Sequence, residues 1–126
     1  MKRIISTDDA PAAVGAYSQG TTDDSVVFTA GQIPLTPDGD LLDDEPIEVQ
    51  TEQVLENVAA VLEEAGASMD DVLKMTVLLD DIDDFEAMNE VYGTYFDEEP
   101  PARSAFEVGS LPKGAGVEIE AIASLE

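Results

Sequence analysis

The sequence contains no cysteine and no histidine. Without cysteine, the chain cannot form disulfides, use a thiolate nucleophile, or bind zinc or iron–sulfur clusters through sulfur. Without histidine, it cannot build a Ser-His-Asp triad or a histidine-ligated metal centre. The groups that remain for chemistry are carboxylates, hydroxyls, the backbone and a few cationic side chains.

Positive charge is also scarce, because the 126 residues include 29 Asp and Glu but only 5 Lys and Arg, for a formal net charge of −24. The acidic residues are spread along the whole chain, so acidity is a property of the surface and not of a tail. Nucleic-acid binding needs clustered Lys or Arg, so we expect no nucleic-acid partner. Molar salt shortens the Debye length to about 3 Å, so this surface predicts a halophilic protein, adapted to a high-salt cytoplasm.

No apolar run is long enough to cross a membrane, and residues 1–9 turn acidic before a signal-peptide core can form. We therefore expect a cytoplasmic protein without membrane contact. The length predicts a single domain over residues 1–126 that buries a sizeable core.

Two segments have the apolar spacing of amphipathic helices. The first covers residues 46–65, and Gly66 can close its end. The second begins near Phe85, with Asp83 or Asp84 as its N-cap, and its apolar stripe continues to Tyr95 and Phe96.

Strand-like segments separate and flank these helices. They cover residues 2–6, 25–30, 72–79, 103–108 and 117–125. Over 72–79 we expect Leu73 to share the buried face with Met75, Val77 and Leu79, and we expect the last two strands to pair as a hairpin. Two helices over one face of a mixed or antiparallel sheet form an α+β architecture, and the other face predicts burial against further subunits.

Three polar residues are candidates for chemistry. Arg103 is the one cation that leads directly into an apolar strand, and its planar guanidinium matches a carboxylate; the alternative is an ion pair with one of the many acids. Asn89 lies on the apolar side of the second helix, where it either lines a polar pocket or ties a loop. Glu118 shares one strand face with Glu120, either as solvated carboxylates or with one of them acting on substrate or water.

Four motifs, in this order and at these separations, resemble the RidA (YjgF) family of reactive imine/enamine deaminases. They lie at residues 10–20, 29–35, 101–104 and 117–123, so the resemblance covers nearly the whole chain. It implies a chorismate-mutase-like α+β fold and a homotrimer with its sites in clefts between subunits. It also implies hydrolysis of 2-imino acids, such as 2-iminobutanoate and 2-iminopropanoate, to 2-keto acids and ammonia, without metal or cofactor.

The resemblance also implies roles for individual residues. Arg103 matches the arginine that holds the substrate carboxylate, and Glu118 matches the glutamate beside the attacking water. The substrate-binding positions are Tyr17, Gly31, Asn89, Arg103 and Ala105. Ala105 stands where the family often has cysteine, and we expect that position to act through its backbone.

Two other functions remain open from the sequence. The same arginine would serve a non-catalytic trimer that binds keto acids or other small metabolites. A nuclease or chaperone-like role is the third possibility, and the charge of −24 opposes the nuclease role.

Overall fold

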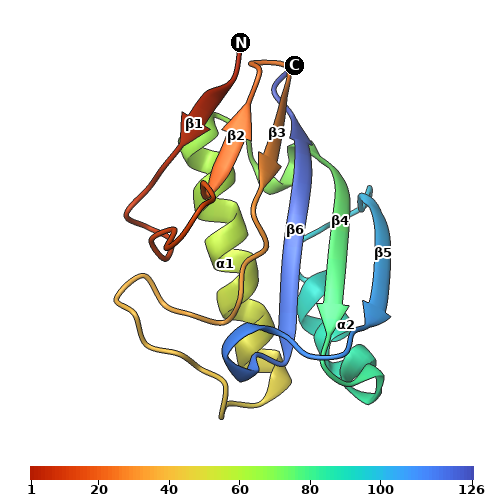
Figure 1. The fold of residues 1–126 in the computed structure, drawn as a ribbon. Helices are drawn as coiled ribbons and strands as arrows, with labels where there is room; N and C mark the ends of the chain where they lie inside the picture. Colours follow the sequence, from red (N-terminus) through yellow and green to blue (C-terminus); the bar gives the residue numbers. More distant parts are fainter.

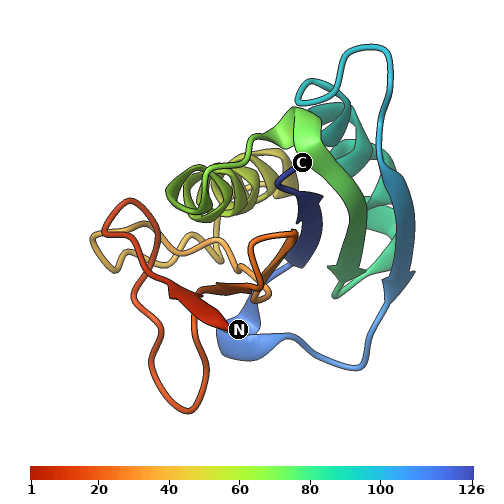
Figure 2. The same ribbon diagram turned by 90° about the horizontal axis from the view of Figure 1, so that it is seen from above.

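The computed structural model describes all residues, 1–126, and contains a six-stranded mixed sheet with both helices on one side (Figures 1 and 2). The strands are β1 (Arg3–Ile5), β2 (Gly20–Thr22), β3 (Val26–Thr29), β4 (Val72–Leu79), β5 (Ala102–Glu107) and β6 (Val117–Ser124). Their order across the sheet is β1-β2-β3-β6-β4-β5, and only β4 and β5 are parallel. The expected α+β class is therefore confirmed.

The expected hairpin between the last two strands is wrong, because β4 lies between β5 and β6. Strand β4, the following helix and β5 form a crossover unit, which places β5 parallel to β4 at the sheet edge. Residues 108–116 then pass the end of β4, where the Asp80 amide donates to the Gly116 carbonyl. Strand β2 was not expected either, because its three residues are too few to show a hydrophobic period.

Helix α1 (Ile47–Ala65) follows the predicted range, and Gly66 ends it in the left-handed conformation with φ of 97°. Helix α2 (Phe85–Gly93) is shorter than the apolar stripe predicted for it, since Tyr95 and Phe96 lie beyond its last residue. The side-chain cap also differs from the expected one, which was Asp83 or Asp84. Asp81 accepts a hydrogen bond from the Asp83 amide in the turn before the helix.

The hydrophobic core lies between the helices and the sheet. Strand β6 buries alternate residues there, as predicted, namely Val117, Ile119, Ala121 and Ala123. The prediction for Leu73 is wrong, because its side chain is 54% exposed. A register shift between Val72 and Lys74 turns Val72 into the core instead.

The other face of the sheet has no helix over it and carries large apolar side chains. Ile4, Phe28 and Phe106 are each about half exposed, and the strand register puts them on this face. This face is therefore more apolar than the surface of a monomeric protein usually is. Neither helix is long and apolar enough to cross a membrane.

Acidic side chains have few cationic partners in the fold. The structure has one salt bridge, between Arg3 and Asp24, and both of its side chains are largely exposed. The negative charge is therefore balanced by solution ions rather than by ion pairs.

We expect the free energy of unfolding to rise as KCl is raised from dilute buffer to molar concentration, because salt screens this repulsion. Each ~1 kcal/mol gained should raise Tm by about 4 °C in a chain of this size. Urea unfolding across a KCl series measures the effect, since urea is uncharged. Equal or greater stability in dilute buffer would contradict the expectation.

Candidate functional site

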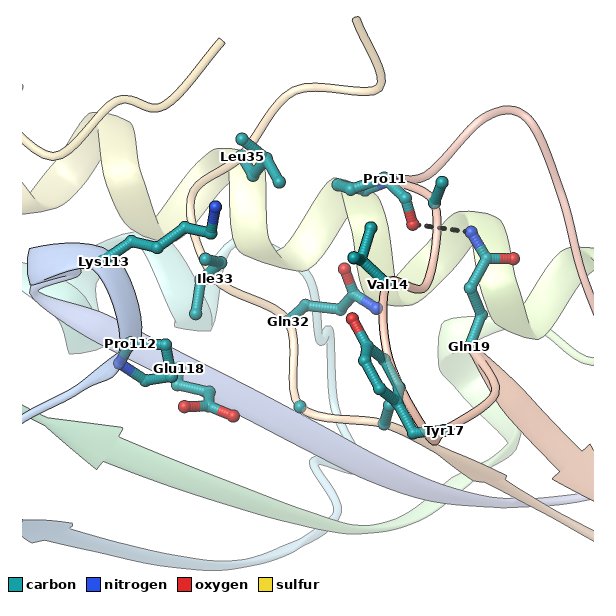
Figure 3. A pocket seen from close by; sticks show the side chains of 13 residues that line it. Pro11, Val14, Tyr17, Gln19, Gln32, Ile33, Leu35, Pro112, Lys113 and Glu118 are labelled. Atoms are coloured by element: carbon teal, nitrogen blue, oxygen red, sulfur yellow. Dashed lines mark hydrogen bonds between the residues drawn. The ribbon is translucent and has the colours of Figure 1, made fainter. Parts of the chain in front are cut away.

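A cavity of about 590 Å³, here the first cavity, opens between the N-terminal loop, the loop after β3 and the start of β6 (Figure 3). Its wall includes three of the predicted residues, Tyr17, Gly31 and Glu118. Apolar side chains of Val14 and Ile33 line it as well. The structure thus brings together residues that are a hundred positions apart in the chain.

Buried amide side chains attach the cavity walls to the scaffold. Gln19 accepts a hydrogen bond from the Thr7 amide at 2.6 Å and donates to the Pro11 carbonyl at 2.7 Å, which fixes the loop that carries Tyr17. Asn57 of α1 donates to the carbonyls of Ile33 and Leu35, at 3.3 and 2.8 Å. Because the Gln19 and Asn57 side chains that form these bonds are buried, the bonds hold the loops in one conformation.

The turn before β6 is held in the same way. Gln50 of α1 accepts from the Gly116 amide at 2.9 Å and donates to the Glu45 carbonyl at 2.8 Å. These bonds join the end of the long loop 30–46 to the turn that carries Lys113. Gln50 therefore ties both loops to α1.

Glu118 and Gly31 are in close approach. A backbone bridge between Gln32 and Ile119, with N···O distances of 2.9 and 3.1 Å, ties the loop after β3 to β6. A Cβ atom on Gly31 would overlap the Glu118 carboxylate, so the carboxylate lies directly over the glycine backbone. Burial, and to a smaller extent the charge of Glu120, raises the pKa of Glu118 above its ordinary value of 4.5.

Arg103 and Asn89 line a different cavity, of about 420 Å³, here the second cavity. The Arg103 Nη1 atom donates to Asn89 Oδ1 at 2.6 Å, and the guanidinium carbon lies 4.7 Å from the Tyr92 ring centroid. The Phe85 ring centroid is 5.3 Å away. Because the one salt bridge of the structure joins Arg3 and Asp24, the alternative reading of Arg103 as half of an ion pair within the chain is wrong.

The contact between Arg103 and Asn89 also shows the role of the Asn89 side chain. It neither ties a loop nor bonds to the backbone, but orients the guanidinium. Arginine has five N–H donors in a fixed fork, and only one is used within the chain. The remaining donors are free to hold an anion.

The two cavities face opposite sides of the sheet. Arg103 pairs with Met75 of β4, whereas Glu118 pairs with Leu78. Positions three apart on one strand point to opposite faces, and Met75 is fully buried under the helices. The register separates Arg103 from Glu118 by about 10 Å along the strands and about 10 Å across them. Within one chain, these two side chains do not meet.

Ala105 lies two residues from Arg103 on β5, on the same face, and packs against the core without lining either cavity. Sequence reasoning missed most residues of the first cavity, Gln32 and Lys113 among them. Lys113 is its one cation and has a left-handed backbone with φ of 57°. The scarcity of lysine was the available signal for Lys113. Gln32 could have been noticed as the neighbour of Gly31 within its motif. No group of three or more acidic side chains is arranged to hold a metal ion.

The family model described as "Endoribonuclease L-PSP" matches residues 7–125. The chain belongs to this family, the RidA (YjgF) family. A RutC family protein of Pyrococcus horikoshii is 51% identical over 100% of both chains. The 2-iminobutanoate/2-iminopropanoate deaminase of Rattus norvegicus is 45% identical and matches 98% of this chain and 90% of its own length.

The solved structures of RidA family members have the same fold. E. coli TdcF, crystallised with bound serine, superposes with a TM-score of 0.92 at 44% identity, covering 97% of this chain and 98% of TdcF. Both the family resemblance and the RidA-like fold expected from the motifs are confirmed.

Proposed function

We propose that this RidA family member hydrolyses reactive 2-imino acids, 2-iminobutanoate and 2-iminopropanoate among them, to 2-keto acids and ammonia. The observation that carries the proposal is the Glu118 carboxylate, half-buried over the Gly31 backbone in the first cavity with a raised pKa. A carboxylate whose pKa is raised is a stronger base than an ordinary one, which suits it to proton transfer. The name of the rat relative, at 45% identity, supports the reaction.

We further propose that two copies of the chain build each site, within a homotrimer. Arg103 and Glu118 lie on opposite faces of one sheet, so a substrate that touches both must lie between copies. The exposed apolar side chains on the face without helices supply surface for that contact. Arg103 of one copy would then complete the first cavity of the next.

The chemistry can be written with these groups. Arg103 binds the substrate carboxylate through its free N–H donors and so places the C=N carbon near Glu118. Glu118 takes a proton from a water molecule as the water oxygen bonds to that carbon, and the nitrogen gains a proton. The resulting carbinolamine loses ammonia as the C–N bond breaks, and the C=O bond forms as its hydroxyl loses a proton. Glu118 carries these protons between oxygen and nitrogen, so no redox partner is needed.

A coupled assay tests the proposal. Threonine dehydratase with threonine releases 2-iminobutanoate, and the formation of 2-oxobutanoate is followed in high KCl with and without this protein. We expect the protein to shorten the lag before 2-oxobutanoate appears. Dehydratase alone at the same KCl concentration is the control, because imines also hydrolyse in water. An unchanged lag at every protein concentration would reject the proposal.

The second candidate is a non-catalytic trimer that binds small metabolites. The crystal structure of TdcF with bound serine favours it, since that relative holds an amino acid. A rise in Tm with serine or 2-oxobutanoate, without any acceleration of imine hydrolysis, would support this candidate over the deaminase.

RNA cleavage, which the family description names, is a weaker candidate for this chain. The charge of −24 repels phosphates, and the five cations do not form a cluster in the sequence. We therefore propose that the protein has no nucleic-acid partner. Tight RNA binding at high salt would contradict this.

Replacing Gly31 with alanine should lower kcat/KM for imine hydrolysis by about 10- to 100-fold. The added Cβ would overlap the Glu118 carboxylate, which must turn away from its position over the backbone. Because a flexible side chain yields, the Tm should change little. Gly109→Ala is the matched control, since nothing lies within 4 Å of a Cβ there. Full activity of Gly31→Ala would contradict the assigned position of the carboxylate.

A further inference from the structure

Gln32 is a buried amide of the first cavity that has no partner of its own. The residue is only 6% exposed, and its side chain forms part of the cavity wall. Figure 3 shows its carboxamide directed into the cavity, on the side of Val14 and Tyr17. No side-chain hydrogen bond in the structure involves this group, although its backbone is bonded to Ile119 on both sides.

The other buried amides of the same region behave differently. Gln19 and Gln50 each use both the donor and the acceptor of the carboxamide to hold loops. Asn57 donates to a loop and accepts from Gln53 of its own helix. The fully buried side-chain atoms without a partner are Thr51 Oγ1 and Tyr92 Oη, so the Gln32 carboxamide, within a residue that is 6% exposed, stays open to the cavity. The backbone of Gln32 already anchors its loop, and its side chain is therefore available for a ligand.

We propose that Gln32 is a substrate-binding residue that selects imino acids whose side chain ends in an uncharged hydrogen-bonding group, a carboxamide above all. This inference rests on the proposed function and names the substrate class of the same site. A carboxamide offers one acceptor and two donors, and a second carboxamide complements it fully. A carboxylate would only accept, and it would lie in a cavity that already holds Glu118.

The rest of the cavity fits such a side chain. Val14 and Ile33 line it beside Gln32 and can cover the methylene groups between the reacting carbon and the terminal amide. Its volume of about 590 Å³ is in the range that holds ligands much larger than 2-iminopropanoate. Glu118 lies at the end of the first cavity near Gly31, so the part of the cavity near Gln32 is free for the substrate side chain.

Binding of two keto acids tests the proposal without requiring turnover. Freshly prepared 2-oxosuccinamate and 4-methyl-2-oxopentanoate have nearly the same shape, but only the first ends in a carboxamide. Calorimetric titration should show that the unchanged protein binds 2-oxosuccinamate about five- to tenfold more tightly. Gln32→Leu, which keeps the size and removes the hydrogen bonds, should reverse that preference. Gln32→Met keeps the length, removes the donor and the acceptor without adding charge, and should weaken only 2-oxosuccinamate.

The outcomes separate a binding role from a structural one. A purely structural Gln32 would lower the affinity for both keto acids equally in either variant, which would overturn the proposal. Equal affinity of the unchanged protein for the two compounds, or binding of neither, would overturn it as well. If the preference is present but no imine is hydrolysed, the substrate-class inference stands and the deaminase proposal fails. Should Gln32→Leu fail to fold, the Gln32→Met titrations decide between the outcomes.

Discussion

Replacing Arg103 with alanine should lower kcat/KM for 2-iminobutanoate by at least about 100-fold while the protein stays assembled. The guanidinium is held by Asn89 and lies near the faces of Tyr92 and Phe85, with its other donors free. Its loss removes the charge-assisted, bidentate contact that fixes the substrate carboxylate, and with it the alignment of the C=N carbon. The coupled dehydratase assay measures the rate, and size-exclusion chromatography in KCl measures assembly.

Two variants control this experiment. Arg103→Lys keeps the charge but lacks the planar fork, so it should recover only part of the rate. Arg3→Ala removes a cation whose side chain pairs with Asp24 at the surface, and should leave the rate unchanged. A fully active Arg103→Ala would reject the proposed mechanism.

Mixing subunits tests whether the site is shared between copies. Arg103→Ala and Glu118→Gln should each have only a residual rate on their own. If the copies assemble as proposed, mixed assemblies should regain activity, because an unchanged Arg103 of one copy can meet an unchanged Glu118 of another. If both residues acted within one chain, no mixture would recover.

The division of the site into two halves is a feature that the sequence alone could not predict. The 3.6-residue period predicts α1 almost to the residue, and the alternation in β6 predicts its buried face. Whether Arg103 and Glu118 lie on the same face of the sheet depends instead on the register of β5 and β6 on β4, which is a long-range property. The expectation that β5 and β6 pair directly was wrong for the same reason.

Local irregularities of the backbone were a second feature of the fold that the sequence did not predict. The shift between Val72 and Lys74 exposes Leu73, and no pattern in that strand signals it. Arg103 could be identified from the sequence as a candidate site residue because cations are so scarce, and its place in a motif gave it a proposed role. Its contact with Asn89 needed the structure, since α2 and β5 come together only in the fold.

Replacing Glu118 with glutamine should lower kcat/KM by about 100-fold or more, the range expected when a general base is removed. The unchanged enzyme should lose activity as the pH falls through the raised pKa of Glu118, because protonation removes the base. Glu118→Gln should lack this loss in its residual rate. The measurement is log kcat/KM against pH in constant KCl.

The raised pKa of Glu118 also determines how this group's contribution to the free energy of unfolding changes with pH. Burial raises the pKa of Glu118 in the folded state, so between the ordinary value of 4.5 and the raised one the folded state binds more protons than the unfolded state. This group's contribution to the free energy of unfolding therefore falls as the pH rises through that interval. Glu118→Gln lacks this term, so its stability relative to the unchanged protein should be greater at pH 7 than at pH 4.

Glu120→Gln is the matched control, since Glu120 lies two residues away on the same strand face and lines neither cavity. Its charge contributes to the raised pKa of Glu118. Removing that charge should move the acid limb of the rate profile to lower pH while the rate at neutral pH stays within about twofold, because proton transfer at Glu118 is preserved. An unshifted limb in Glu120→Gln, together with an unchanged rate in Glu118→Gln, would show that another group controls the proton transfer.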